Sequence, residues 1–185
     1  RRKGKKVDAE VRGALVERMK DGCDLTDSQE KIFRDLEELI GDEESGWKHL
    51  GSPYVGVKME IKYQQQEKGS YRAAFGRACG TADCTAEEAA AWYFEYCSRE
   101  RMAVDREDGN PARLEIRKGE GAINEKLFAT VKKFPFPLHN REFVQRFVWK
   151  KTQTGIEVAW VPTDDYVDYG GIKKGIRGTT TGLFK

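Results

Sequence analysis

The sequence predicts an α+β protein in which a curved antiparallel sheet packs on helices. Three observations support this fold class. Hydrophobic residues recur at helical spacing up to Gly41, they alternate with polar residues from Trp47 onward, and four strand-like runs with short connections follow the turn at residues 108–111. Consecutive strands joined by short connections pair in antiparallel fashion, so we expect one such sheet.

Two helices are predicted ahead of Trp47. The first spans about residues 7–21 and ends at Gly22, where a helix C-cap belongs. The second opens with Thr26 and Gln29, which have the spacing of a capping box, and it ends at Gly41. We therefore expect residues 1–46 to form an N-terminal helical extension and residues 47–185 to form the main domain.

The main domain begins with a predicted hairpin, in which the alternating runs Tyr54–Tyr63 and Tyr71–Cys79 are joined by a turn at residues 68–70. A second capping box, Thr85 and Glu88, predicts one helix from Ala86 to Met102, with an aromatic face that packs in the core. The later strands are predicted at Arg113–Arg117, Glu125–Lys133, Glu142–Lys151 and Ile156–Val161.

The composition excludes several classes of protein. With 38% hydrophobic and 35% charged residues, the 185-residue chain is typical of a soluble globular domain with one core. Basic and acidic side chains are mixed along the chain, so no basic stripe for nucleic acid is expected. The four cysteines lack paired metal-ligand spacing, and neither a membrane span nor a secretory signal is visible. We expect a cytoplasmic protein with reduced thiols and no bound metal.

No set of residues predicts catalysis. The two histidines, His49 and His139, lie in different segments, and neither stands beside a candidate nucleophile. The motifs of nucleotide-binding loops, zinc proteases and serine hydrolases are absent. We therefore expect no catalytic residues, no cofactor and no enzymatic activity.

One segment carries a more specific pattern. Two prolines, Pro135 and Pro137, join two predicted strands, and the second strand opens with Arg141-Glu142-Phe143-Val144. This arrangement resembles that of START (StAR-related lipid-transfer) domains, where a proline-marked turn leads into Arg-Asp-Phe-Val and Glu142 takes the place of the aspartate. The resemblance covers roughly Trp47 to Lys185 and is closest to START-like proteins of algae and related protists.

The resemblance implies a helix-grip fold, shared by START and Bet v 1-like proteins, that holds one apolar ligand. The family continues beyond the point that corresponds to Lys185 with further strands and a C-terminal helix. We therefore expect that helix to be absent from this chain and the domain to be incomplete at its C-terminus. In some sterol-carrying members an acid and a base lie inside the cavity, and the matching positions are Phe128 and Phe147 here.

A cavity in such a fold is lined by one face of the sheet. Alternation in the strand Glu142–Lys151 places the aromatic residues on one side and Arg146 and Lys150 on the other. The predicted cavity residues are Phe128, Phe143, Gln145, Phe147, Trp149, Val158 and Trp160. The alternative is that these aromatic side chains simply fill a packed core.

The resemblance also implies a mobile lid between the strand ending at Val161 and the one starting near Ile176. Its apolar residues are Tyr166, Val167, Tyr169 and Ile172, flanked by acidic residues and lysines 173 and 174. Such a loop is suited to transient contact with a membrane surface, and a solvated irregular loop is the alternative.

These observations give two hypotheses for function. The first is that the chain binds a lipid or sterol-like ligand in an internal cavity, as a carrier or sensor module within a larger protein. The second is that a START-like scaffold without ligand acts as a protein-interaction or structural subunit, with a protein partner or the missing C-terminal region packed on it.

Overall fold

The computed structural model describes residues 2–41, 46–63, 74–116, 122–172 and 175–185. The chain divides into two compact units, one of Arg1–Glu37 with Thr85–Lys185 and one of Glu38–Cys84. This division differs from the expected one into residues 1–46 and 47–185. The reason is that Leu15 and Met19 of the first helix, and Phe33 of the second, are buried in clusters that include residues of the main sheet.

The larger unit is built on an antiparallel sheet in the order β4-β5-β6-β7-β9. A sixth, two-residue strand, β8, pairs in parallel with the start of β6. The strands are β4 (Ala112–Ile116), β5 (Glu125–Lys132), β6 (Arg141–Lys151), β7 (Ile156–Pro162), β8 (Ile176–Arg177) and β9 (Gly182–Phe184). The prediction of an α+β fold with a curved antiparallel sheet is confirmed.

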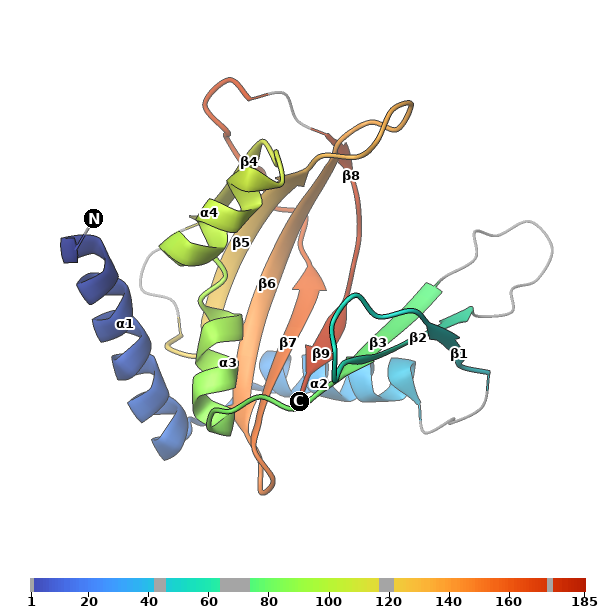
Figure 1. Ribbon diagram of the computed structural model, residues 1–185. Helices are drawn as coiled ribbons and strands as arrows, with labels where there is room; N and C mark the ends of the chain where they lie inside the picture. Colours follow the sequence, from blue (N-terminus) through green and yellow to red (C-terminus); the bar gives the residue numbers. More distant parts are fainter. Residues whose placement is uncertain (1, 42–45, 64–73, 117–121, 173–174) are drawn as a thin grey trace. The chain divides into compact units, whose positions relative to one another are not determined.

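Helices cover both faces of this sheet. The helices α1 (Arg2–Asp21), α3 (Ala86–Phe94) and α4 (Arg99–Glu107) lie on one side of the sheet, and α2 (Asp27–Ile40) lies on the other (Figure 1). Throughout, the inner face denotes the side of the sheet toward α3, and the outer face denotes the side toward α2.

Local signals account for most helix ends. In the capping box of α3 the Glu88 amide donates to Thr85 Oγ1 over 3.2 Å, and the Thr85 amide donates to the Glu88 carboxylate over 2.8 Å. The equivalent bonds join Thr26 and Gln29 at the start of α2. Gly22 ends α1 with a φ of 80°, a left-handed conformation that glycine adopts without steric cost.

The expected single helix from Ala86 to Met102 is wrong. The chain leaves α3 after Phe94, and Ser98 caps a separate helix, α4, by accepting a hydrogen bond from the Arg101 amide. A serine side chain competes for backbone groups inside a helix and favours a new N-terminus. The break separates the two tyrosines of the predicted helix face, Tyr93 in α3 and Tyr96 in the connection.

The smaller unit contains a three-stranded antiparallel sheet of β1 (Lys48–Leu50), β2 (Lys58–Tyr63) and β3 (Ala74–Cys79). The predicted hairpin corresponds to β2 and β3, which pair over their full length. The strand β1 was not predicted, and β2 begins four residues later than expected because residues 53–56 form a turn. The predicted turn at residues 68–70 and the start of the second run, residues 71–73, lie outside the described residues.

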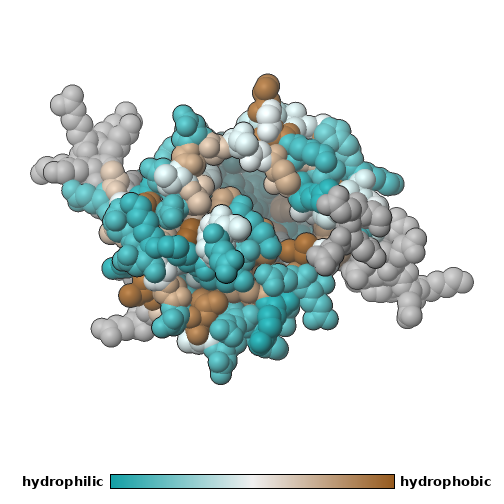
Figure 2. Space-filling view, turned by 90° about the horizontal axis from the view of Figure 1, so that it is seen from below, coloured by the Kyte–Doolittle hydropathy of each residue, from teal (hydrophilic) through white to brown (hydrophobic). Residues whose placement is uncertain are grey.

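The surface is predominantly hydrophilic on the side seen in Figure 2, where smaller hydrophobic areas interrupt a surface of polar residues. This matches a chain in which 35% of residues are charged. Among the described residues, buried apolar side chains form three clusters, which all include residues of the larger sheet.

Candidate functional site

Strand pairing places all seven predicted cavity residues on the inner face. In β6 the odd-numbered residues Phe143, Gln145, Phe147 and Trp149 share this face. Across the sheet, Phe128 of β5 pairs with Gln145, while Trp160 and Val158 of β7 pair with Phe147 and Trp149. Directly paired residues of neighbouring strands point to the same side, so the predicted register of β6 matches the structure.

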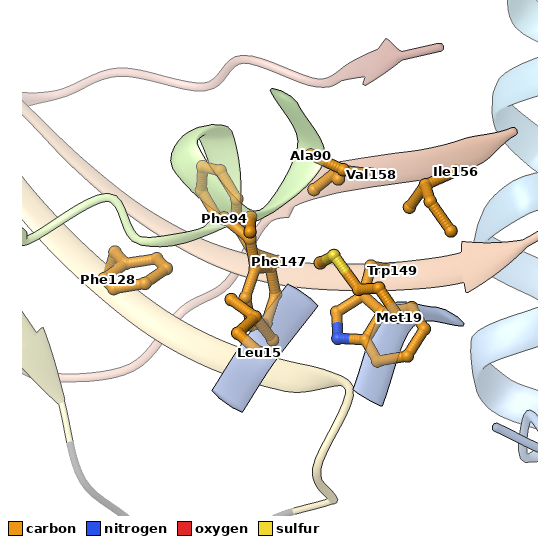
Figure 3. Packing of buried hydrophobic residues seen from close by; sticks show 10 residues of the cluster. Leu15, Met19, Ala90, Phe94, Phe128, Phe147, Trp149, Ile156 and Val158 are labelled. Atoms are coloured by element: carbon orange, nitrogen blue, oxygen red, sulfur yellow. The ribbon is translucent and has the colours of Figure 1, made fainter. Parts of the chain in front are cut away.

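One end of the inner face is a packed core, and we call it the closed end. Here Trp149 and Val158 are fully buried, together with Ile156 at 4% exposure. They belong to one buried cluster with Leu15 and Met19 of α1 and with Ala90, Ala91 and Phe94 of α3. In Figure 3, Met19 lies beside Trp149 and Ala90 lies beside Val158. Trp149 and Val158 therefore lie in a packed core, which is the alternative to a cavity that the sequence allows for these residues.

The middle of the inner face is an aromatic cluster. Phe147 is 2% exposed and lies 5.0 Å, centroid to centroid, from Phe128 and 6.0 Å from Trp160. Tyr93 stacks on Phe184 of β9 at 4.8 Å, and Tyr96 lies 5.3 Å from Phe147. Such ring pairs each contribute about 0.5–1.5 kcal/mol beyond their burial. The cluster fixes the chain between α3 and α4 against the sheet.

Toward the start of β6 the inner face is less completely covered, and we call the part from Trp160, at the margin of the aromatic cluster, to Phe143 the open end. Both rings are only half-buried, although they lie on the same face as the fully buried Trp149. Gln145, between them along the strand direction, is buried and donates to the Thr180 carbonyl over 3.4 Å. Large apolar rings, one polar amide and a neighbouring loop therefore meet at this end.

A buried ionic cluster borders the inner face on its β4–β5 side. Asp105 of α4 is 4% exposed and accepts from Arg113 over 2.7 Å; it also pairs with Lys132. Asn110 donates to the same carboxylate over 3.2 Å. Register places both Arg113 and Lys132 on the inner face, where one carboxylate compensates the two cations only in part.

The tyrosines of the aromatic cluster hold cations over their rings. The Arg113 guanidinium lies 4.1 Å from the Tyr96 centroid, and that of Arg101 lies 4.9 Å from it. Burial, together with the nearby Arg113 charge, lowers the pKa of Arg101. Burial also raises the pKa of the Tyr93 hydroxyl and of the Cys97 thiol, each to about 12. These two groups stay protonated at neutral pH, which leaves them poor nucleophiles.

Two of the four predicted lid residues pack on the outer face of the sheet. Val167 and Tyr169 are buried in a cluster with Ala129, Val131 and Val144, which all point to the outer face. The lid prediction followed from the resemblance, but apolar side chains of β4 and β5, together with Val144 of β6, form an outer surface on which Val167 and Tyr169 pack. Tyr166 and Ile172 are exposed, at 80% and 41%. Lysines 173 and 174 lie outside the described residues.

An arginine holds this loop to the sheet. Arg177 of β8 forms an ion pair with the buried Glu142 at 3.1 Å and donates to the carbonyls of Thr163 and Asp165. Burial and the neighbouring Glu142 carboxylate raise the pKa of Tyr169. Glu142, the acid of the Arg-Glu-Phe-Val pattern, thus anchors the loop on the outer face, while Phe143, the next residue, lies at the open end.

Sequence reasoning missed several residues of the site. Tyr93, Tyr96 and Phe184 complete the aromatic cluster, and Asp105 and Arg113 form the core of the ionic cluster. The three-residue spacing of Tyr93 and Tyr96 suggested only core packing. No periodicity in the sequence relates Asp105 to Arg113 and Lys132, because a helix, a turn and two strands bring them together.

Within the described residues, no helix is long and apolar enough to cross a membrane, and no group of histidine, cysteine and acidic residues is arranged to hold a metal ion. Neither a protein-family model nor a curated protein matches the sequence.

Solved structures do resemble this one. A STAR-related lipid transfer protein from Xanthomonas axonopodis matches with a TM-score of 0.52 at 19% identity, over 75% of this chain and 72% of that one. The lipid transfer and protein localization domain of human StarD13 (DLC2) matches with a TM-score of 0.51 at 14% identity, over 87% and 74%.

A third structure, human STARD10, matches with a TM-score of 0.50 at 16% identity, over 85% of this chain and 58% of that one. At these identities the likeness concerns the fold. The chain therefore has the helix-grip α+β fold of StAR-related lipid-transfer domains.

Proposed function

We propose that this protein binds a lipid or sterol-like apolar ligand at the open end of the inner face, as a carrier or sensor module in the cytoplasm. The observation that carries the proposal is the contrast along one face of β6, where Trp149 is fully buried and Phe143 is only half-buried. Covering the exposed parts of Phe143 and Trp160 with a ligand removes apolar surface from water. Each buried methylene of the ligand adds about 0.8 kcal/mol.

The ionic cluster supports an amphipathic ligand. It lies on the same face as the aromatic rings, so an apolar chain and a polar end group would each find a suitable surface. The similarity to solved lipid-transfer domains supports the same class of ligand.

A binding role is favoured over catalysis by the state of the polar groups. Asp105, Arg113 and Lys132 are engaged in ion pairs, and the pKa values of Tyr93 and Cys97 lie at about 12. General acid–base catalysis is efficient when the pKa of the catalytic group lies near the working pH. These groups are better suited to hold a ligand than to transfer protons.

Transient contact with a membrane surface is part of this proposal. Phe136 and Leu138, in the turn after β5, are 97% and 54% exposed, and Tyr166 follows β7. Strands β5 and β7 both run antiparallel to β6, so the segments that follow them leave the sheet at the same end, near the start of β6 (Figure 1). Exposed apolar side chains at one end of the sheet favour contact with the lipid–water interface.

Native mass spectrometry of gently purified protein, followed by lipid extraction, tests the proposal. We expect a co-purifying apolar molecule at up to one per chain, and its loss in a Phe143→Glu variant, because a carboxylate at the open end opposes burial of an apolar ligand. Tyr54→Glu, at a 70% exposed position of the smaller unit, serves as the matched control and should keep the molecule. Protein that never carries a lipid, even after incubation with vesicles, would instead support the ligand-free interaction scaffold.

A further inference from the structure

Two aromatic rings of the open end lie directly against glycine backbones. Gly182 of β9 pairs with Trp160, and a Cβ atom at this glycine would lie 2.6 Å from Cε2 and Cη2 of the indole. A Cβ at Gly178 would lie 2.6 Å from Cε1 of Phe143. These distances are far shorter than van der Waals contact, so neither position accepts a side chain unless the ring above it moves.

Space, rather than backbone conformation, is the reason for glycine at both positions. Neither Gly178 nor Gly182 has a positive φ, unlike Gly170 and Gly171 in the preceding loop. An L-residue could adopt the same backbone at 178 and 182, and only the ring excludes it. The contact resembles the known packing of an aromatic side chain over a glycine on a neighbouring strand.

Because neither glycine has a side chain, each ring can lie close to a glycine backbone, Trp160 over Gly182 and Phe143 over Gly178. Trp160 and Phe143 belong to the adjacent strands β7 and β6, and both are half-buried on the inner face. Tyr93 of α3 faces Trp160 from the covering layer, with 5.5 Å between ring centroids. A side chain at residue 182 would push the indole away from the sheet and toward Tyr93, which would narrow the space between the sheet and its covering layer at the open end.

We propose that Gly178 and Gly182 set the width of the ligand that the open end accepts, by keeping the rings of Phe143 and Trp160 low. This inference rests on the proposed lipid-binding function and adds the residues that determine ligand size. An alanine at either position narrows the site, so a broad fused-ring molecule is penalised more than a single hydrocarbon chain.

The contact between Gly182 and the Trp160 ring is tested first, in the absence of ligand. Gly182→Ala should lower the melting temperature, because overpacking displaces Trp160. In the double variant Trp160→Leu/Gly182→Ala the added alanine should cost little, since the smaller side chain leaves room for the methyl group. Equal losses of melting temperature from the alanine in both backgrounds would overturn the proposed contact.

Ligand width is then tested with two fluorescent probes, dehydroergosterol as the fused-ring molecule and cis-parinaric acid as the single chain. In Gly182→Ala we expect dehydroergosterol to bind about tenfold more weakly and cis-parinaric acid to change by less than about twofold. The double variant should recover dehydroergosterol binding. Gly13→Ala is the matched control, because its added methyl group meets nothing within 4 Å, and it should leave both affinities unchanged.

The outcomes separate this inference from the proposed function. If the unaltered protein binds cis-parinaric acid but not dehydroergosterol, or if Gly182→Ala weakens both probes equally, the width inference is wrong while lipid binding stands. If the unaltered protein binds neither probe, both proposals are overturned. Should Gly182→Ala fail to fold, recovery of fold and of dehydroergosterol binding in the double variant supports the inference, and a double variant that also fails to fold contradicts it.

Discussion

Trp149 and Phe143 point to the same face of one strand, yet their surroundings differ. Trp149 is fully buried under α1 and α3, whereas Phe143, six residues earlier, is only half-buried. The side chains are of the same kind, and the strand is continuous between them. Alternation along a strand therefore selects which residues share a face, while the element that covers the face decides whether they form a core or a surface on which a ligand can bind.

The largest expected loss of stability comes from a substitution at the closed end. Trp149→Ala removes a side chain that is fully buried among α1, α3 and β7, so it should lower the free energy of unfolding by about 3–5 kcal/mol. Urea denaturation followed by far-UV circular dichroism measures this loss. A loss below about 1 kcal/mol would show that the closed end is not a tightly packed core.

The next largest loss of stability is expected from a substitution in the ionic cluster that borders the inner face. Asp105→Ala leaves Arg113, which is 9% exposed, without its carboxylate, and the free energy of unfolding should fall by about 3 kcal/mol. Glu107→Ala, at an exposed position on the same helix, is the control and should change it by less than about 0.5 kcal/mol. Similar values for the two variants would mean that Asp105 does not hold the cations in place.

The aromatic cluster should make stability sensitive to alkaline pH. Burial raises the pKa of Tyr93 and Cys97 from 10.0 and 9.0 to about 12, and it also raises that of Tyr96. The neutral forms are favoured in the folded protein, so this stability is fully present below pH 9 and is lost as the pH rises through about 12.

Thermal unfolding from pH 8 to pH 12 measures this dependence. Cys97→Ala removes the group of the cluster with the lowest unfolded pKa, so the decline of stability between pH 9 and pH 10 should be shallower in that variant. An identical profile in both proteins would indicate that the Cys97 thiol ionises as readily in the folded chain as in the unfolded one.

The smallest effect on stability is expected at the open end. Phe143→Ala should cost less than Trp149→Ala, about 2 kcal/mol, because part of the Phe143 ring is already exposed to water in the folded protein. Phe143→Ala should also weaken the binding of cis-parinaric acid. This loss of affinity should exceed the loss measured for those Trp149→Ala molecules that remain folded. A Phe143→Ala loss as large as that of Trp149→Ala would remove the distinction between the two ends.

The sequence predicted the sheet and the shared face of β6 because period-two alternation depends only on the local chain. The same rule applied to Phe147 placed it correctly on the inner face with Phe143 and Gln145. What covers that face depends on contacts between residues far apart in the chain. Alternation could not show that Met19 would lie over Trp149, nor that Asp105 would meet Arg113 and Lys132.

Two further differences have local physical reasons. Ser98 ended the expected long helix because its side chain caps a new one, although the surrounding pattern is helical. Val167 and Tyr169 were expected in a lid, but the apolar outer face at Ala129, Val131 and Val144 offered them a buried position. An irregular loop leaves no periodicity from which its packing partners can be predicted.

Photo-crosslinking with a diazirine-bearing fatty acid tests the central claim most directly, because it reports where a bound chain lies. Residue-level mass spectrometry should find the label on Phe143, Trp160 and the segment 178–184 of the open end, and unlabelled competing lipid should abolish it. A label confined to the outer face, or one spread over exposed loops and unaffected by competitor, would contradict the claim that the open end binds the ligand.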